Sequence, residues 1–249
     1  GGSGNDQYHV EDAGDVVVEL SEEGYDRVFV DGLSSYTLPD HVERLTFVDA
    51  GNHVGKGNAG DNRLEGNVGK DRFLIDEGGA DTYSGGNNFD VFDARGTSEQ
   101  VRLYLNDQDL NGYAIEGDFF ASIETFIGSS SAGDIMKADP NGRARFAGDG
   151  GDDRLWGSNN TDYMRGDAGN DDLRGGSGRD TIHGGTGNDD LRGGSGRDQF
   201  RFTEAEFGQD TIHDYQDGLD YLRFYSDIAT AFSDFSVSGN GSNQVRVTL

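Results

Sequence analysis

One nine-residue unit repeats six times without an insertion between Gly148 and Arg201, and no other feature of the chain constrains its fold as strongly. Six consecutive copies indicate stacked structural units in which each unit completes the core of its neighbours. The sixth position of the unit is always aspartate and the eighth is always a large apolar residue. These positions are Asp153, Asp162, Asp171, Asp180, Asp189 and Asp198, and Leu155, Met164, Leu173, Ile182, Leu191 and Phe200.

Each unit divides into a turn and a short strand. The first six residues are rich in glycine, which adopts left-handed backbone conformations without a Cβ clash. The last three alternate polar, apolar and polar, as in a strand with one face toward a core. Two units therefore predict an 18-residue rung of turn, strand, turn and strand, and the fold class is an all-β parallel β-roll. Consecutive turns then lie on opposite edges, with Asp153, Asp171 and Asp189 on one edge and Asp162, Asp180 and Asp198 on the other.

The spacing of these aspartates predicts bound cations. Rungs stack about 4.8 Å apart, and two carboxylates at that distance repel by about 0.9 kcal/mol in water and about 3.5 kcal/mol at an effective dielectric of 20. The available ligands are carboxylate and turn carbonyl oxygens, which suit Ca²⁺. The chain has no Cys, and its five His are scattered, so the sequence does not support a soft-metal site. We expect at least four calcium ions in residues 148–201.

The unit GGxGxDxUx, with U a large apolar residue, is the general calcium-binding β-helix repeat, and in this form the sequence resembles the repeats-in-toxin (RTX) family of secreted bacterial proteins. The resemblance implies that two successive turns on the same edge share each ion. Each of the two turns supplies two carbonyls and its Asp. Gly175, Ser177 and Asp180 would then share an ion with Gly194, Gly196 and Asp198. The implied turn ligands are Gly148, Gly150, Gly151, Gly157, Asn159, Asn160, Gly166, Asp167, Ala168, Gly169, Gly175, Gly176, Ser177, Gly178, Gly184, Gly185, Thr186, Gly187, Gly193, Gly194, Ser195 and Gly196.

Three turns depart from the pattern. Ser158 and Asn160 replace glycines in one, and Asp149 and Asp167 replace the second glycine in others. Asn tolerates left-handed geometry, and backbone carbonyls remain whatever the side chain. We expect weakened sites there, particularly around Asn160.

Degenerate copies of the unit lie outside this tract. Their spacing pairs Asp6 with Asp26, Asn62 with Asp81, and Asp71 with Asp90, and Asp210 could complete a final site with Asp189. Asn62 lacks a charge, so its site should bind less tightly. A solenoid with glycine turns and no metal remains the alternative for residues 57–93.

Short strands are expected between and after these turns. The segments, rich in β-branched and aromatic residues, are VVVEL (16–20), RVFV (27–30), SYTL (35–38), RLTFV (44–48), VRLYL (101–105), GYAI (112–115) and FFASIETFIG (119–128). A C-terminal hairpin is expected around residues 239–243. The chain then divides into a degenerate N-terminal roll (1–96), a non-repeat β connector (97–137), a regular roll (138–201) and a C-terminal β-rich cap (202–249).

Composition narrows the functional class. Acidic residues outnumber basic ones by 47 to 20 over 249 residues, for a net charge of −27, which disfavours nucleic acid as a partner. The sequence has no apolar run of about 20 residues, the length that a membrane-spanning helix needs. We therefore expect no direct membrane insertion. Such acidity is also typical of disordered chains.

Each unit buries about one apolar side chain, worth roughly 1.5 to 3 kcal/mol, whereas ordering nine residues costs about 1 to 2 kcal/mol for each residue. Folding is therefore expected to require calcium.

No catalytic constellation is present, so we predict a binding module and not an enzyme domain. The resemblance implies an extracellular module that leaves a bacterium unfolded through a type I secretion channel and folds on calcium outside, stabilising its parent protein. The closing residues QVRVTL look like a strand cut short, as in a piece of a larger protein. A structural or adhesive surface segment and an accessory module of a secreted epimerase, lipase or metalloprotease remain alternatives. The oligomeric state is open.

Overall fold

A computed structural model describes residues 1–76, 78–105, 112–113, 115–203, 207–225, 236–238 and 245–248. The chain forms two compact units, Gly1–Thr97 with Asp107–Ile127 and Ser98–Asn106 with Gly128–Leu249. The described residues are all β-strand, turn or irregular structure. Among them there is no helix of the length and hydrophobicity that crossing a bilayer requires. The predicted parallel β-roll is confirmed.

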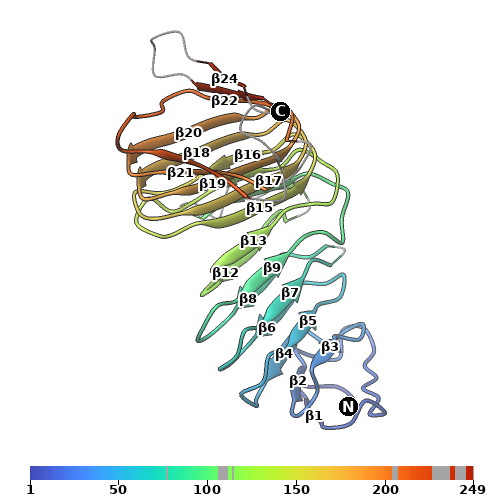
Figure 1. Ribbon diagram of the computed structural model, residues 1–249. Helices are drawn as coiled ribbons and strands as arrows, with labels where there is room; N and C mark the ends of the chain where they lie inside the picture. The colour runs from blue at the N-terminus through green and yellow to red at the C-terminus, as the bar shows by residue number, and fades with distance from the viewer. Residues whose placement is uncertain are drawn as a thin grey trace. The chain divides into compact units, whose positions relative to one another are not determined.

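The first unit has two parallel sheets whose strands stack as rungs (Figure 1). One sheet contains β1 (Gln7–Val10), β2 (Arg27–Val30), β4 (Arg44–Phe47), β6 (Arg63–Glu65), β8 (Thr82–Ser84) and β12 (Phe119–Ala121). The other contains β3 (Ser35–Thr37), β5 (Val54–Lys56), β7 (Arg72–Leu74), β9 (Val91–Asp93) and β13 (Thr125–Ile127). The unit also includes the short strand β11 (Gly112–Tyr113).

An aromatic core fills the first unit. In register, Tyr83 pairs with Phe120 and Phe92 with Phe126, one pair in each sheet. The Phe92 and Phe120 rings meet edge to face with centroids 4.8 Å apart. Rings of this size bury much apolar area per residue, which lets a rung with few residues hold its two sheets together.

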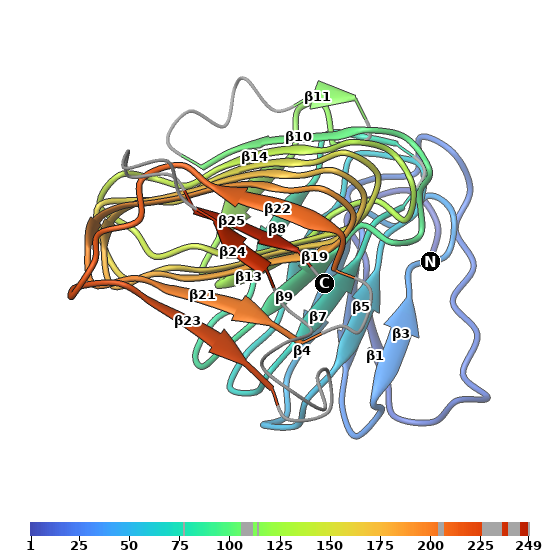
Figure 2. The same cartoon turned by 45° about the horizontal axis from the view of Figure 1, so that its top comes forward.

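The second unit contains the regular repeats, and Figure 2 shows its sheets as the two walls of a flattened coil. One wall is β10 (Val101–Tyr104), β14 (Ile135–Lys137), β16 (Arg154–Trp156), β18 (Asp172–Gly178), β20 (Asp190–Gly196) and β22 (Gln209–Ile212). The other is β15 (Arg145–Gly150), β17 (Tyr163–Ala168), β19 (Thr181–Thr186), β21 (Gln199–Phe202) and β23 (Tyr221–Phe224).

The eighth position of every unit faces the core of the coil, as the repeat predicts. In one wall Leu155 pairs with Leu173, and in the other Met164 pairs with Ile182, so partners are 18 residues apart. The apolar residues at this position in the strict tract are all 0% exposed. Two nine-residue units therefore make one rung.

The C-terminal residues extend the coil before the strand direction changes. Strands β22 and β23 each add one parallel strand to a wall. After them β25 (Val245–Thr248) runs antiparallel to β22, and β24 (Ser236–Ser238) runs antiparallel to β25. The hairpin turn expected around residues 239–243 lies outside the described residues.

One expected strand does not form. Residues 16–20 (VVVEL) are extended without strand pairing, and Val16, Val18 and Leu20 are 83%, 68% and 64% exposed. Glu19, in contrast, is only 6% exposed. The β-propensity of valine predicted a strand, but the alternation places the wrong side chains inward for a hydrophobic core, so no sheet face is available to this segment.

Candidate metal centre

Aspartates at the sixth position of the repeat form two hydrogen-bonded columns in the second unit. In each column the backbone N–H of one Asp donates to Oδ1 of the Asp one rung later. The four bonds within the strict tract are Asp153 to Asp171 (2.8 Å), Asp171 to Asp189 (2.9 Å), Asp162 to Asp180 (2.9 Å) and Asp180 to Asp198 (2.9 Å). The structure thus brings together the pairs that the 18-residue spacing predicts on each edge.

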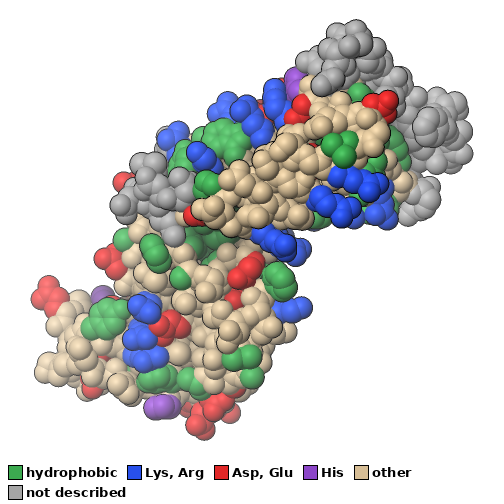
Figure 3. Space-filling view, turned by 90° about the vertical axis from the view of Figure 1, so that its left-hand side faces the viewer, with side chains coloured by type: hydrophobic (Ala, Val, Ile, Leu, Met, Phe, Trp, Pro, Cys, Tyr) green, Lys and Arg blue, Asp and Glu red, His purple; other side chains and the backbone are tan. Residues whose placement is uncertain are grey.

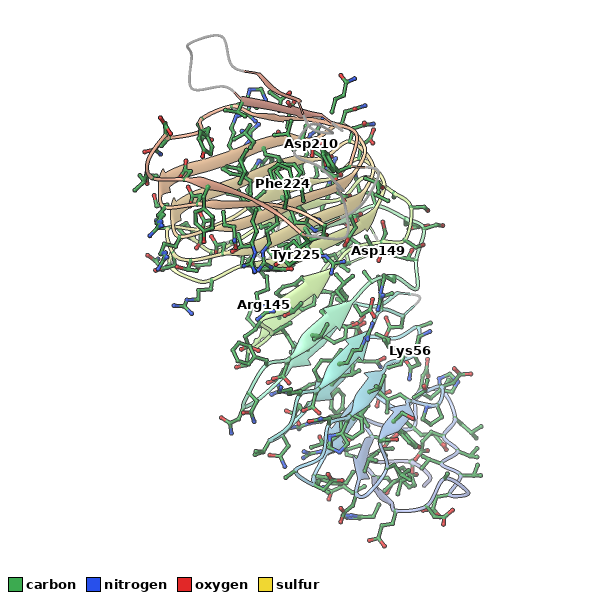
Figure 4. The ribbon with its side chains drawn as sticks, viewed as in Figure 1. Lys56, Arg145, Asp149, Asp210, Phe224 and Tyr225 are labelled. Carbon is green, nitrogen blue, oxygen red and sulfur yellow. The ribbon has the colours of Figure 1, made fainter. Side chains whose placement is uncertain are left out.

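Both columns continue past the strict tract. Asp189 N–H donates to Asp210 Oδ1 (3.1 Å), which places Asp210 in the column where the sequence put it; Figure 4 labels this residue in β22. Asp134 N–H donates to Asp153 (2.7 Å) and Asp198 N–H to Asp220 (2.9 Å). The 18-residue period does not predict the places of Asp134 and Asp220 in the columns, because their spacings of 19 and 22 residues break it. The signal that remains is an acid two residues before an apolar strand residue, as with Met136 and Leu222.

The second oxygen of most of these carboxylates is buried and has no hydrogen-bond partner. This holds for Oδ2 of Asp153, Asp171, Asp180, Asp189, Asp198 and Asp210. The six aspartates of the strict tract are at most 2% exposed. An ionised oxygen removed from water with no compensating partner is costly. The repeated orphan oxygen therefore fits a cation at most rungs of the two columns.

Oxygen atoms crowd the turns on both edges, which explains the glycines. A Cβ on Gly184 would meet Asp189 Oδ2, the orphan oxygen of the same unit. A Cβ on Gly187, whose φ is 132°, would meet the carbonyl oxygen of Gly169 in the preceding same-edge turn. Carboxylate and carbonyl oxygens therefore share a confined space, and this set of donors suits a hard cation such as Ca²⁺.

Basic side chains are prominent on the surface outside these turns. Although acids outnumber bases by 47 to 20, the face shown in Figure 3 carries groups of Lys and Arg with only scattered Asp and Glu. On the outer face of the coil Arg174 pairs with Asp172 (2.6 Å) and lies 5.9 Å from the Trp156 ring centroid.

Burial makes these carboxylates resist ionisation. Burial, reinforced by the charge of Asp189, raises the pKa of Asp171 to about 7. Burial and the charge of Asp198 raise the pKa of Asp180 to about 7, and burial raises that of Asp153 to about 9. A bound cation favours the ionised form of a carboxylate. At neutral pH the ionised columns are therefore less stable without a cation than with one.

Without calcium, the second unit is expected to hold more β-structure near pH 5 than near pH 8. The folded chain binds protons more tightly than the unfolded chain, in which the pKa of Asp is about 3.9. Between about pH 4 and 7 the folded state therefore carries more protons, and its stability falls as pH rises through the folded pKa values. Circular dichroism of metal-free protein across this range measures the effect. A β signal that grows with rising pH would show that ionised carboxylates are tolerated without metal.

The three turns that depart from the strict pattern differ in their contacts or backbone geometry. Ser158 donates from its N–H (2.6 Å) and its Oγ (3.0 Å) to Asp162 Oδ2, so this carboxylate has no orphan oxygen. Asn160 Nδ2 donates to the carbonyls of Asn141 (3.0 Å) and Gly142 (2.9 Å) in the preceding turn. Asp149 and Asp167 occupy the left-handed region with φ of 75° and 76°. These are the turns for which the sequence predicts weaker sites.

The same columns occur in the first unit. Asp6 N–H donates to Asp26 Oδ1, Asn62 N–H to Asp81 Oδ1 and Asp71 N–H to Asp90 Oδ1, each at 2.7 Å. The structure therefore brings together the three N-terminal pairs. Asp81 N–H continues to Asp118 (2.9 Å) and Asp90 N–H to Glu124 Oε2 (2.8 Å). These last two acids were missed because 37 and 34 residues separate them from their partners.

A further carboxylate lies beside Asn62. A Cβ on Gly57 would meet both Asn62 Oδ1 and Asp76 Oδ2, so the two oxygens converge on the same turn. Asp76 Oδ2 is buried without a partner. Burial and the charge of Asp81 raise the pKa of Asp76 to about 8. Asp76 occupies the first position of the degenerate unit DEGGADTYS (76–84), where the strict repeat has glycine, and it places a carboxylate beside Asn62.

These columns of acidic turns on a parallel β-roll define a class of repeat protein, and comparison with known families gives the same class. The model of the RTX calcium-binding nonapeptide repeat matches residues 49–78, 141–173 and 165–200. The chain therefore contains RTX calcium-binding repeats, as the resemblance implied.

Whole-chain comparisons add a likeness to solved structures. No curated protein matches the sequence. The extracellular lipase LipA from Serratia marcescens is 23% identical to this chain with a TM-score of 0.29, and the likeness covers 91% of this chain. The chain spans 43% of the length of that lipase.

Proposed function

We propose that the chain is a calcium-binding β-roll module in which ions lie between successive same-edge turns and hold the rungs together. The supporting observation is the buried Oδ2 without a partner that recurs at nearly every rung of both columns. Each proposed site combines two aspartates from adjacent rungs with turn carbonyls. In the regular repeats the pairs are Asp153 with Asp171, Asp171 with Asp189, Asp162 with Asp180, Asp180 with Asp198, and Asp189 with Asp210.

The degenerate repeats also bind calcium in this proposal. Asp71 and Asp90 form one site, which retains an orphan oxygen on Asp90. Asn62 and Asp81 form another, where the carboxylate of Asp76 supplies the charge that Asn62 lacks. This second site is supported by Asn62 Oδ1 and Asp76 Oδ2, which converge beside Gly57.

The biological role that we propose follows from the coupling of calcium to folding. Extracellular calcium modules bind with dissociation constants of about 10⁻⁴ to 10⁻³ M. A module of this affinity stays empty and unfolded inside a bacterium, can pass through a type I secretion channel as an unfolded chain, and folds outside where calcium is plentiful. The folded module then stabilises the extracellular protein to which it belongs.

Equilibrium dialysis of the metal-free chain against calcium tests the proposal. We expect several ions per chain, at least four of them assigned to residues 148–201, with half-saturation at about 10⁻⁴ to 10⁻³ M. The same chain dialysed against magnesium is the control, because Mg²⁺ requires a smaller octahedral site and retains water. Binding of no calcium, or equal binding of the two ions, would refute a calcium module.

A further inference from the structure

The stretch from Val16 to Leu20 has an inverted arrangement of side chains. Its aliphatic residues Val16, Val18 and Leu20 are 64–83% exposed, whereas the Glu19 side chain between them is 0% exposed. Hydrophobic burial alone would favour the opposite orientation, because it buries aliphatic groups and leaves carboxylates in water. An interaction specific to the Glu19 carboxylate must therefore hold this segment.

The Glu19 carboxylate points toward the first turns of the first unit. Ligand oxygens of Asp6, Glu19 and Asp26 all lie within 4.8 Å of one another. Asp26 is 1% exposed and Glu19 is 6% exposed. Three buried or half-buried carboxylates at such distances repel strongly unless positive charge lies among them, and the Gly1 ammonium, 2.9 Å from Glu19 Oε1, balances only one of the three.

The hydrogen bonds in this cluster leave one oxygen free on each of the two buried acids. Asp26 Oδ1 accepts from the N–H of Asp6 (2.7 Å), and Glu19 Oε1 accepts from the Tyr8 hydroxyl and from the Gly1 amine (2.9 Å). Asp26 Oδ2 and Glu19 Oε2 are buried without a partner. The carboxylates are thus fixed in place by their partnered oxygens, while their other oxygens remain available to a ligand.

We propose that Asp6, Glu19 and Asp26 bind one divalent cation, with Glu19 reaching into the site from the segment between two turns. The site lies outside the residues that match the nonapeptide repeat, and its third carboxylate is absent from the two-aspartate sites of the columns. Three carboxylates around one ion leave a net charge of −1, a hard oxygen environment that favours Ca²⁺. The choice of calcium rests on the proposed function, whereas the position of the site rests on this cluster.

The segment from residue 11 to residue 26 gains a role from this site. It contributes no strand to the first unit, yet Glu19 attaches it to the two turns that begin and end it. The ion therefore replaces sheet hydrogen bonds as the element that orders the segment.

Calcium binding by the unmodified chain and by its Glu19→Gln variant tests the proposal. We expect the variant to bind one ion fewer at saturating calcium, or that one ion at least tenfold more weakly, with the calcium-induced gain of β signal otherwise retained. Glu11→Gln is the matched control, since Glu11 is an exposed acid of the same segment. It should bind as the unmodified chain does.

The Asp6→Asn variant and the double variant that combines Asp6→Asn with Glu19→Gln show whether Asp6 and Glu19 share one ion. Each single variant should lose the same ion, and the double variant should lose no more than one. Hydrogen exchange at residues 11–26 should also become faster in Glu19→Gln when calcium is present. Unchanged stoichiometry and affinity in Glu19→Gln, or loss of two ions in the double variant, would overturn the proposal. A chain that binds calcium nowhere would instead refute the proposed function.

Discussion

Removal of calcium at neutral pH is expected to abolish most of the β-structure of the second unit. Each nine-residue unit buries about one large apolar side chain, and the Asp columns place unpartnered carboxylate oxygens inside the coil. Without ions, the loss of backbone entropy and the burial of charge both oppose folding. The core favours folding by only roughly 1.5 to 3 kcal/mol per unit. Folding and metal binding are then a single event.

Circular dichroism and hydrogen exchange measure this coupling. The β signal should collapse when a chelator removes calcium and should return when calcium is added in excess. Hydrogen exchange should locate the largest change between residues 148 and 201, while magnesium at the same concentration should restore little. Protection of residues 148–201 that is independent of calcium would show that the coil is stable by its core alone.

Asp189→Asn is expected to shift the calcium midpoint for folding to a concentration at least about tenfold higher, a difference of about 1.4 kcal/mol. Asp189 lies between Asp171 and Asp210 in one column, so the substitution removes charge from two proposed sites. The amide oxygen of Asn can still accept the hydrogen bond that Asp171 N–H gives to Asp189 Oδ1 (2.9 Å). The variant therefore tests the charge of the carboxylate separately from the backbone ladder.

The neighbouring acid supplies a matched control for this variant. Asp190 has a side chain that is 59% exposed and contacts His213 Nε2 at 2.6 Å. Asp190→Asn makes the same change in net charge one residue away, on the outer face of the wall. Its calcium midpoint should stay within about twofold of the unmodified chain, because exposed ion pairs contribute little. Equal shifts in the two variants would mean that overall charge, and not the column, controls binding.

The periodic part of the fold could be predicted from the sequence because every rung is built alike. Glycine turns, a polar–apolar–polar strand and an 18-residue rung together place Leu155 beside Leu173 and Asp162 beside Asp180. Local pattern and long-range pairing coincide in such a solenoid, since each rung contacts only its neighbours. The predicted parallel β-roll is confirmed for this reason.

The remaining column residues escaped prediction where the chain between rungs varies in length. Asp118 follows its partner Asp81 by 37 residues, and Asp220 follows Asp198 by 22. A longer connection changes the number of residues between two stacked strands but not their stacking. A fixed residue spacing therefore fails to identify the partner, although the strands still pair in the sheet. Asp76 illustrates a related limit, because it replaces the first glycine of a degenerate unit and still brings its carboxylate to the turn that contains Asn62.

The strand expected at residues 16–20 failed for a different reason. Its valines fit a sheet by propensity, but strand formation also needs a neighbouring edge and a core for one face. The buried Glu19 and the exposed Val16 and Val18 show that a polar interaction decides the orientation of this segment. Single-residue propensity contains no information about such an interaction.

Anomalous scattering from crystals grown with calcium can identify ions between the turns, because calcium gives a signal that water and the light atoms of the protein lack. We expect calcium peaks in rows along both edges of the second unit, each between carboxylates one rung apart, including Asp171 with Asp189 and Asp180 with Asp198. Ordered turns on both edges with no anomalous peaks between those carboxylates would refute the calcium columns.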